Sequence, residues 1–316
     1  MSLAFVFPGQ GAQSIGMGRA LAEAYPAAQA VFDEVDDALG EKLSALIWEG
    51  DADELTLTQN AQPALMATSM AALRALEAEG TGVAAARFVA GHSLGEYSAL
   101  AAAGALSVAD TARLLRTRGA AMQKAVPVGQ GAMAAILGLG LETVREVAAE
   151  AAQGEVCQAA NDNDPTQVVV SGATAAVERA AEIAKAKGAK RAVMLPVSAP
   201  FHCALMQPAA DAMQQALADV AIAAPVVPLV ANVRAEAVTD PETIRQLLVE
   251  QVTGAVRWRE SVQYMAAQGV TSAWEIGAGK ALSGMIRKID RAIACQAVGT
   301  PEDVKKAVES RGESNV

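Results

Sequence analysis

The sequence is poor in histidine and cysteine, and each shortage excludes a class of protein. Its 316 residues include two histidines, His92 and His202, so any mechanism that needs an imidazole must use one of them. The three cysteines, Cys157, Cys203 and Cys295, form no Cys-x-x-Cys pair. This spacing argues against a disulfide framework and against a zinc site, so we expect no bound metal.

Basic residues are also scarce: 25 lysines and arginines stand against 35 aspartates and glutamates, for a formal net charge of −10. Nucleic-acid-binding proteins usually show the opposite balance, so we exclude that class. The chain begins without a basic leader. The apolar stretch Leu94–Leu106 contains Glu96 and is shorter than the roughly 20 residues that span a bilayer. We therefore expect a cytoplasmic protein that does not bind membranes.

The sequence is rich in apolar residues, which make up 52% of the chain against 19% charged residues. A chain of this length and composition can bury a large core. It typically forms two domains, or one large domain that carries an insertion.

Short apolar runs alternate with longer alanine-rich helical patterns over the first 128 residues. Strands are predicted at Leu3–Phe7 and Arg87–Ala90, and helices at Glu96–Ala103 and Val108–Ala125. Strands separated by helices indicate a parallel sheet that is covered on both faces. The same alternation returns after Pro196.

The segment between these two parts has a different order of elements. It predicts strands at 132–137, 156–160, 167–171 and 191–195 and helices at 141–152 and 175–187, with a turn over Asn161–Pro165. This β-α-β-β-α-β order is typical of ferredoxin-like domains. We therefore predict an α/β fold with a large parallel-sheet domain in two parts, residues 1–128 and 197–316. A small ferredoxin-like domain, residues 129–196, is inserted between them.

A candidate nucleophile lies between a predicted strand and a predicted helix. The segment Gly91-His92-Ser93-Leu94-Gly95 matches Gly-x-Ser-x-Gly. Glycines allow the sharp turn that leaves a serine hydroxyl exposed at the end of a strand. The free N–H groups of the following helix point at the place where an oxyanion would form.

A serine hydroxyl needs a base that takes its proton. His92 is adjacent to Ser93, so its side chain should point elsewhere, and only His202 remains as a partner. A lone histidine is more often a buried core residue, but elimination favours His202 as the base. An α/β-hydrolase would place its histidine late in the chain, after an acidic residue, and the position of His202 weakens that interpretation.

One arginine lies on an apolar stripe. On the predicted helix at Val108–Ala125, Leu114, Arg118 and Met122 are spaced by four residues and share one face. Arginine in such a place needs an anionic partner, and its guanidinium can hold a carboxylate through two hydrogen bonds. The partner could be a substrate or an internal aspartate or glutamate, and from the residues alone the internal salt bridge is the more common case.

Several motifs occur together in a fixed order along nearly the whole chain. They are Phe7-Pro8-Gly9-Gln10-Gly11-Ala12-Gln13, Gly91-His92-Ser93-Leu94-Gly95-Glu96-Tyr97-Ser98-Ala99, Arg116-Thr117-Arg118-Gly119, Asn161-x-Asn163, Pro200-Phe201-His202 and Glu275-Ile276-Gly277-Ala278-Gly279-Lys280. With them the sequence resembles the malonyl-CoA:acyl-carrier-protein transacylase family of bacterial fatty-acid synthesis. It departs from the family pattern at Gly254-Ala255, where Asn-Pro is common, and at Ala278, where proline is usual.

The resemblance implies a catalytic apparatus and a large domain like that of the α/β-hydrolases. Ser93 would take the malonyl group from coenzyme A as an ester, and His202 would act as base and then as acid. The family orients this histidine by a backbone carbonyl, and Gln251 matches that position. The backbone N–H groups of Gln10 and Leu94 match the oxyanion hole.

The resemblance also implies a substrate pocket and partners. Arg118 would bind the malonyl carboxylate, and Met122, His92 and Phe201 would lie beside the acyl group. The bulk of Phe201 would leave little room for the extra methyl of methylmalonyl, although size alone discriminates by only about 1–3 kcal/mol. The implied partners are malonyl-CoA, as a substrate, and acyl carrier protein. We expect a monomer that needs no cofactor.

Two other functions fit the same residues. A serine hydrolase or thioesterase would use the same pair, Ser93 and His202, and release the acyl group to water. A protein that only docks acyl carriers would keep the fold with a vestigial site. The presence of nucleophile, base and carboxylate ligand together argues against the second.

An acidic carrier protein conflicts with a net charge of −10, so docking requires a local basic patch. Two clusters are candidates: Lys185, Lys187, Lys190 and Arg191 on the predicted insertion, and Arg287, Lys288 and Arg291 near the end of the chain. Each cluster could equally be a solvated helix face.

Overall fold

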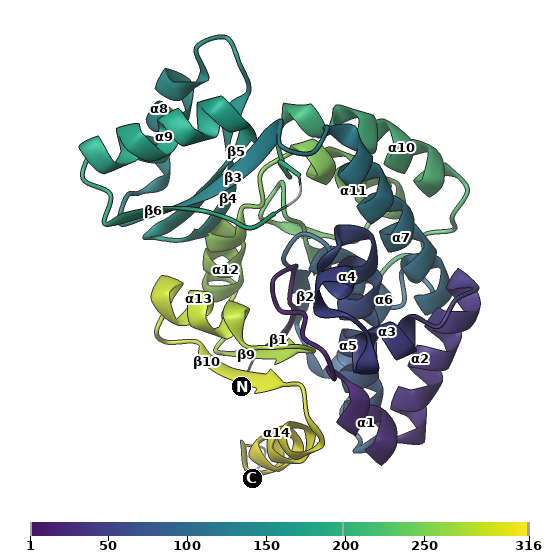
Figure 1. The fold of residues 1–316 in the computed structure, drawn as a ribbon. Helices are drawn as coiled ribbons and strands as arrows, with labels where there is room; N and C mark the ends of the chain where they lie inside the picture. Colours follow the sequence, from purple (N-terminus) through teal and green to yellow (C-terminus); the bar gives the residue numbers. More distant parts are fainter. Residues whose placement is uncertain (1, 198, 315–316) are drawn as a thin grey trace.

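The computed structural model describes residues 2–197 and 199–314. They form two β-sheets, each covered by its own helices (Figure 1). The larger sheet has the strand order β10-β9-β1-β2-β7-β8. Neighbouring strands from β10 to β7 are parallel, and β8 is antiparallel to β7. The strands are β1 (Leu3–Phe7), β2 (Phe88–Gly91), β7 (Leu229–Val230), β8 (Ala237–Val238), β9 (Ser272–Ile276) and β10 (Ala294–Val298).

Helices cover both faces of this sheet. They are α1 (Arg19–Ala24), α2 (Pro26–Leu39), α3 (Leu43–Glu49), α4 (Ala52–Thr56), α5 (Thr58–Ala78), α6 (Gly95–Ala102), α7 (Val108–Ala125), α10 (Gln207–Ala218), α11 (Pro241–Thr253), α12 (Trp258–Ala267), α13 (Ala281–Ile289) and α14 (Pro301–Ser314), with 3₁₀ turns η1 (Val83–Ala85) and η2 (Ala204–Met206). None of the helices in the described residues is both long and apolar enough to cross a membrane.

The side chains of the central strand β1 show why helices pack on both faces of the sheet. All five of its residues are buried. Successive side chains of a strand point to opposite faces, so Phe5 and Phe7 pack into the core formed with α2, α5, α6 and α7. Ala4 and Val6 pack on the other face, with α12 and α13. A strand buried on both faces is typical of a parallel sheet, as the sequence predicted.

The smaller sheet is antiparallel, with the order β4-β5-β3-β6. Its strands are β3 (Gly131–Leu137), β4 (Cys157–Asp164), β5 (Gln167–Ala173) and β6 (Arg191–Met194), and its helices are α8 (Leu141–Ala152) and α9 (Thr174–Ala186). The helices pack on one face of the sheet, which confirms the predicted ferredoxin-like arrangement. The predicted domain boundaries at residues 129 and 196 stay a prediction.

The predicted turn over Asn161–Pro165 is wrong in most of its length. Strand β4 continues through Asp164, with two irregularities in its register. The carboxylate of Asp162 lies 2.8 Å from Arg259, and that of Asp164 lies 2.9 Å from Lys288. These distant cations satisfy buried acidic side chains, and such tertiary contacts override the turn preference of asparagine and aspartate.

Candidate active site

The candidate site lies at the carboxyl ends of the parallel strands. The loop Pro8–Gln10 follows β1, the turn His92–Leu94 follows β2, and Asn232 follows β7. In open parallel sheets this edge is where ligands usually bind, because loops from neighbouring strands meet there. The three segments thus bring residues that are far apart in the sequence to one place.

The turn that carries Ser93 is tightly packed and strained. Ser93 has a φ of 54°, a left-handed conformation that costs a non-glycine residue about 1–3 kcal/mol. A Cβ on Gly91 would lie 1.9 Å from the carbonyl oxygen of Gly95, and a Cβ on Gly95 would lie 2.2 Å from that of Phe7. Both positions therefore require glycine, which explains the Gly-x-Ser-x-Gly spacing.

Ser93 and His202 lie in hydrogen-bond contact, although 108 residues separate them in the chain. The hydroxyl oxygen of Ser93 is 2.7 Å from Nε2 of His202, and Nδ1 of His202 is 2.9 Å from the backbone carbonyl oxygen of Gln251. A carbonyl can only accept, so Nδ1 carries the proton and Nε2 is left to accept from the serine hydroxyl. This is the geometry that a general base needs.

His202 is held as a neutral imidazole. Its side chain is buried, and burial lowers its pKa to about 3, with the charge of Arg118 acting in the same direction. A protonated imidazole could not take a proton from serine. The low pKa therefore keeps the base available at neutral pH.

Arg118 is a buried cation with neutral partners. It is 1% exposed and donates to the side-chain oxygens of Gln62 (2.7 Å), Gln251 (2.8 Å) and Ser93 (3.1 Å). No aspartate or glutamate forms an ion pair with it within residues 2–197 and 199–314, so the structure does not contain the internal salt bridge that the sequence left open. A buried charge without a counter-ion favours the binding of an anion.

Two backbone N–H groups lie close to the serine turn, on different segments. A Cβ on Gly9 would lie 2.7 Å from the carbonyl oxygen of His92, so the Gly9–Gln10 loop lies directly against the serine turn. The side chain of Gln10 accepts from the hydroxyl of Thr58 at 2.6 Å, which anchors this loop. In the part of the chain that the structure describes, the N–H groups of Gln10 and Leu94 have no hydrogen-bond partner and can donate to an oxyanion.

A cavity of about 410 Å³ opens over these groups. Every predicted site residue apart from Gln251 lines it, together with Met133, Asn161 and Leu195–Val197 from the small sheet and its exit. Gln251 lies behind His202 and is fully buried. The cavity therefore lies between the two sheets and has Ser93, His202 and Arg118 on its wall.

His92 forms a hydrogen bond with a residue other than Ser93. Its Nε2 lies 2.8 Å from the side-chain oxygen of Asn163 on β4, and its ring lies beside that of Trp258. Burial lowers the pKa of His92, so it also stays neutral. His92 thus joins the serine turn to the small sheet and leaves His202 as the imidazole next to Ser93.

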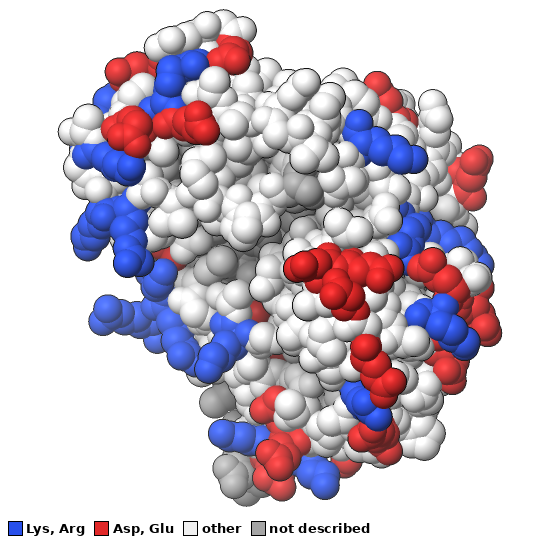
Figure 2. Space-filling view, viewed as in Figure 1, with Lys and Arg blue, Asp and Glu red and all other residues white. Residues whose placement is uncertain are grey.

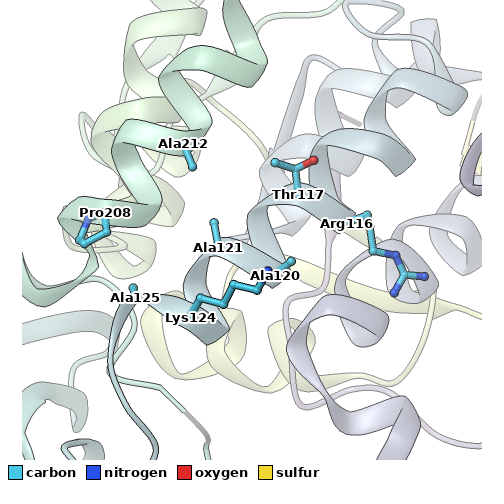
Figure 3. A pocket seen from close by; sticks show the side chains of 8 residues that line it. All are labelled: Arg116, Thr117, Ala120, Ala121, Lys124, Ala125, Pro208 and Ala212. Atoms are coloured by element: carbon cyan, nitrogen blue, oxygen red, sulfur yellow. The ribbon is translucent and has the colours of Figure 1, made fainter.

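A second cavity, of about 510 Å³, lies between α7 and the start of α10 (Figure 3). Its lining comes from the side of α7 that carries Thr117 and Ala121, whereas Arg118 and Met122 of the same helix line the cavity with the nucleophile. Four of the eight lining residues are alanines, and Lys124 and Arg116 are the cations (Figure 3). No imidazole or carboxylate lines this cavity, so it offers no pair of nucleophile and base.

Sequence reasoning missed two supporting side chains. Asn232 accepts from the backbone N–H of Ser93 at 2.8 Å and donates to the carbonyl of Gly91 at 2.6 Å, which braces the strained turn. The sequence feature that could have identified Asn232 is a polar residue just after the carboxyl end of strand β7. Gln62 on α5 holds Arg118, and no local pattern distinguishes it from other polar helix residues.

The comparison with known proteins agrees with this geometry. A family model described as an acyl transferase domain matches residues 4–302. The chain belongs to the acyl transferase family. Within this family it is 49% identical to the malonyl CoA-acyl carrier protein transacylase of Bacillus subtilis over 314 residues, which cover 99% of this chain and 98% of the relative.

Solved structures of acyl transferases show the same fold. The acyl-carrier-protein S-malonyltransferase of Bartonella henselae superposes with a TM-score of 0.96 at 58% identity, covering 99% of this chain and 100% of that one. A malonyl-transacylase in complex with its type II PKS acyl-carrier protein superposes with a TM-score of 0.95 at 42% identity, covering 98% and 100% of the two chains. The predicted fold class and family are therefore confirmed.

Proposed function

We propose that this acyltransferase moves a malonyl group from malonyl-CoA to the phosphopantetheine thiol of acyl carrier protein, through a malonyl ester on Ser93. One observation carries the proposal. The hydroxyl of Ser93 contacts a neutral imidazole and a buried guanidinium at the same time. The first can activate the hydroxyl, and the second can bind an acyl group that ends in a carboxylate.

In the first half-reaction, Nε2 of His202 takes the hydroxyl proton while the oxygen of Ser93 attacks the thioester carbon of malonyl-CoA. The negative charge that forms on the carbonyl oxygen accepts hydrogen bonds from the N–H groups of Gln10 and Leu94. The carbon–sulfur bond then breaks, and His202 returns the proton to the leaving sulfur of coenzyme A. Arg118 holds the malonyl carboxylate throughout.

The second half-reaction runs the same steps with another thiol. His202 takes the proton of the phosphopantetheine thiol, and the sulfur attacks the ester carbon. The bond to the oxygen of Ser93 breaks, and this oxygen recovers its proton from His202. The Nδ1 contact with the Gln251 carbonyl stabilises the imidazolium in both directions.

The choice of acyl group follows from the cavity wall. Phe201 and Met122 are buried and leave room beside Arg118 for a short dicarboxylic acyl group. We propose that Phe201 disfavours the branched methylmalonyl group. The reaction needs no redox or metal chemistry, and we propose an enzyme without a cofactor that works as a monomer in the cytoplasm.

Intact-protein mass spectrometry separates the transferase from a hydrolase that uses the same pair. After mixing with malonyl-CoA, we expect a mass increase of one malonyl group that disappears in Ser93→Ala and on addition of carrier protein. A Thr117→Ala variant, altered on the far side of α7, should keep the adduct. Steady release of coenzyme A and free malonate, with no transfer to the carrier, would instead support the hydrolase.

The structure joins the two basic clusters that the sequence left apart. Lys288 on α13 binds Asp164 at the end of β4, and the backbone N–H of Lys190 donates to Leu137 at the end of β3. Figure 2 shows basic side chains gathered along this side of the molecule, over the small sheet and α13. Lys185 and Lys187 are paired with Glu182 and Glu150, so they add less free charge.

We define the basic band as Lys190, Arg191, Arg287 and Arg291, which are exposed and form no ion pair among the described residues. Strand β6 runs from Arg191 toward Leu195, which lines the cavity. An acidic carrier bound on the band would thus lie near the entrance to the site. Such a band would let an acidic carrier bind despite the overall charge of −10.

Charge reversal tests the basic band. We expect Lys190→Glu/Arg191→Glu to raise the KM for acyl carrier protein by about tenfold at low salt, and the difference should shrink at high salt because the charges are exposed. The control is Lys305→Glu/Lys306→Glu on α14, which reverses as much exposed charge away from the band. Loading from malonyl-pantetheine, which lacks phosphates, should be unchanged. An unaltered KM and salt dependence in the band variant would contradict the docking site.

A further inference from the structure

A buried carboxyl group lies below the active site and takes no part in the steps above. Glu96, in the first turn of α6, is 1% exposed. Within the described residues no lysine or arginine forms an ion pair with it. Its hydrogen bonds come from the side-chain amide of Gln251 and, at 3.4 Å, from the backbone N–H of Asn232. Glu96 is therefore a buried carboxyl group without a direct counter-ion. Arg118 is likewise a buried cation without one.

One amide group connects these two charges. Nε2 of Gln251 donates to Glu96 and to the carbonyl of Ser93, while Oε1 of Gln251 accepts from Arg118 at 2.8 Å. The amide dipole thus has its positive end at the carboxylate and its negative end at the guanidinium. The backbone carbonyl of the same residue accepts from His202. Gln251 therefore links Glu96 to the cation and to the base.

The protonation of Glu96 depends on few other groups. Burial raises its pKa to about 7, and the charge of Arg118 opposes this rise. The titratable group next to it in the chain is Tyr97, whose pKa burial raises. His202 is linked to Glu96 only through Gln251, and burial lowers the pKa of His202 and keeps it neutral. Arg118 is the cation that favours the ionised form of Glu96.

We propose that Glu96 is a positioning residue that balances the charge of Arg118 through Gln251 in the free enzyme and takes up a proton when a malonyl carboxylate binds Arg118. This inference rests on the proposed function. A malonyl carboxylate brings a second anion to the same buried cation. Two anions and one cation in a buried site repel, and a proton on Glu96 removes the excess charge. As a neutral acid, Glu96 still accepts from Gln251, so the amide can keep its orientation.

Proton uptake during acyl loading tests this inference. Acyl transfer from a thioester to a hydroxyl releases no proton of its own, so malonyl-CoA and acetyl-CoA differ only by the carboxylate of the acyl group. In weakly buffered solution at pH 7.5, we expect about half a proton more per malonyl-enzyme than per acetyl-enzyme, with acyl-enzyme counted by mass. The difference should vanish in Glu96→Gln, which keeps the size of the side chain, and persist in Glu302→Gln on the surface of α14.

The pH dependence of selectivity gives a second test that needs only the wild-type protein. Above the pKa of Glu96, loading of malonyl requires a proton from solution, whereas loading of acetyl does not. The ratio of kcat/KM for malonyl-CoA to that for acetyl-CoA should therefore fall by up to about tenfold per pH unit above pH 7. A merely structural role for Glu96 would leave this ratio flat.

The outcomes separate the two proposals. A malonyl adduct on Ser93 without extra proton uptake, or with uptake unchanged in Glu96→Gln, would overturn the role of Glu96 and leave the transferase intact. Absence of the adduct would overturn both. A selectivity ratio that does not change with pH would contradict the inference even if Glu96→Gln fails to fold.

Discussion

Replacing His202 with alanine should lower the rate of malonyl loading by about 10⁴-fold or more. The structure offers no substitute base, because His92 is bound to Asn163 and is directed away from the hydroxyl of Ser93. In the variant, the hydroxyl of Ser93 would keep its contact with Arg118, a cation that cannot take a proton. Single-turnover loading from malonyl-CoA, followed by intact-protein mass, measures this effect.

Two controls separate loss of the base from loss of the fold. The variant should unfold at a temperature close to that of the wild type when only the imidazole is missing, and added imidazole should restore part of the rate through the cavity. His202 lies in a strained backbone with a φ of 58°, so His202→Asn, which tolerates this conformation better, is the companion variant. A loss smaller than tenfold in both variants would show that another group activates Ser93.

Arg118→Ala should lower loading from malonyl-CoA by about 10²- to 10³-fold while loading from acetyl-CoA falls by less than about tenfold. The guanidinium binds the carboxylate of malonyl, which acetyl lacks. Its loss also removes hydrogen bonds to the hydroxyl of Ser93 and to the side chain of Gln251, which accounts for the smaller effect on acetyl. The measurement is kcat/KM for each acyl-CoA in the same enzyme preparation.

Arg116→Ala is the matched control, two residues away on the same helix. Its guanidinium contacts Glu41 and Asn60, away from the cavity with the nucleophile. We expect it to leave the ratio of malonyl to acetyl loading unchanged. Arg118→Lys should fall between wild type and alanine, because lysine keeps the charge but not the two-pronged geometry. Equal losses for both acyl groups in Arg118→Ala would contradict its assignment as the carboxylate ligand.

Much of the fold could be predicted where local pattern and tertiary environment agree. Helix α7 and helix α8 begin and end at the predicted residues, because their apolar spacing marks a single buried face. Strand β1 was equally clear. Strand β10 and helices α13 and α14 were not predicted. Strand β4 was predicted too short, because asparagine and aspartate favour turns unless distant partners satisfy them.

The sequence by itself predicted the turn that carries Ser93 and its contact with His202. The Gly-x-Ser-x-Gly spacing marks a sharp turn within five residues, and a chain with two histidines leaves little choice of imidazole. The apolar spacing on α7 also placed Arg118 on a buried face. These features depend on local conformation and on residue counts, which a linear sequence shows directly.

Only the tertiary structure decided what surrounds these residues. The contacts of Gln251 with Arg118 and with Glu96, and that of Asn232 with Ser93, join residues more than 130 positions apart. Gln62 lies 56 positions from Arg118. Such contacts arise where the carboxyl ends of parallel strands and the ends of packed helices meet. The local periodicity of apolar residues determines which face of a helix is buried. The packing of distant elements determines which atoms the side chains on that face contact.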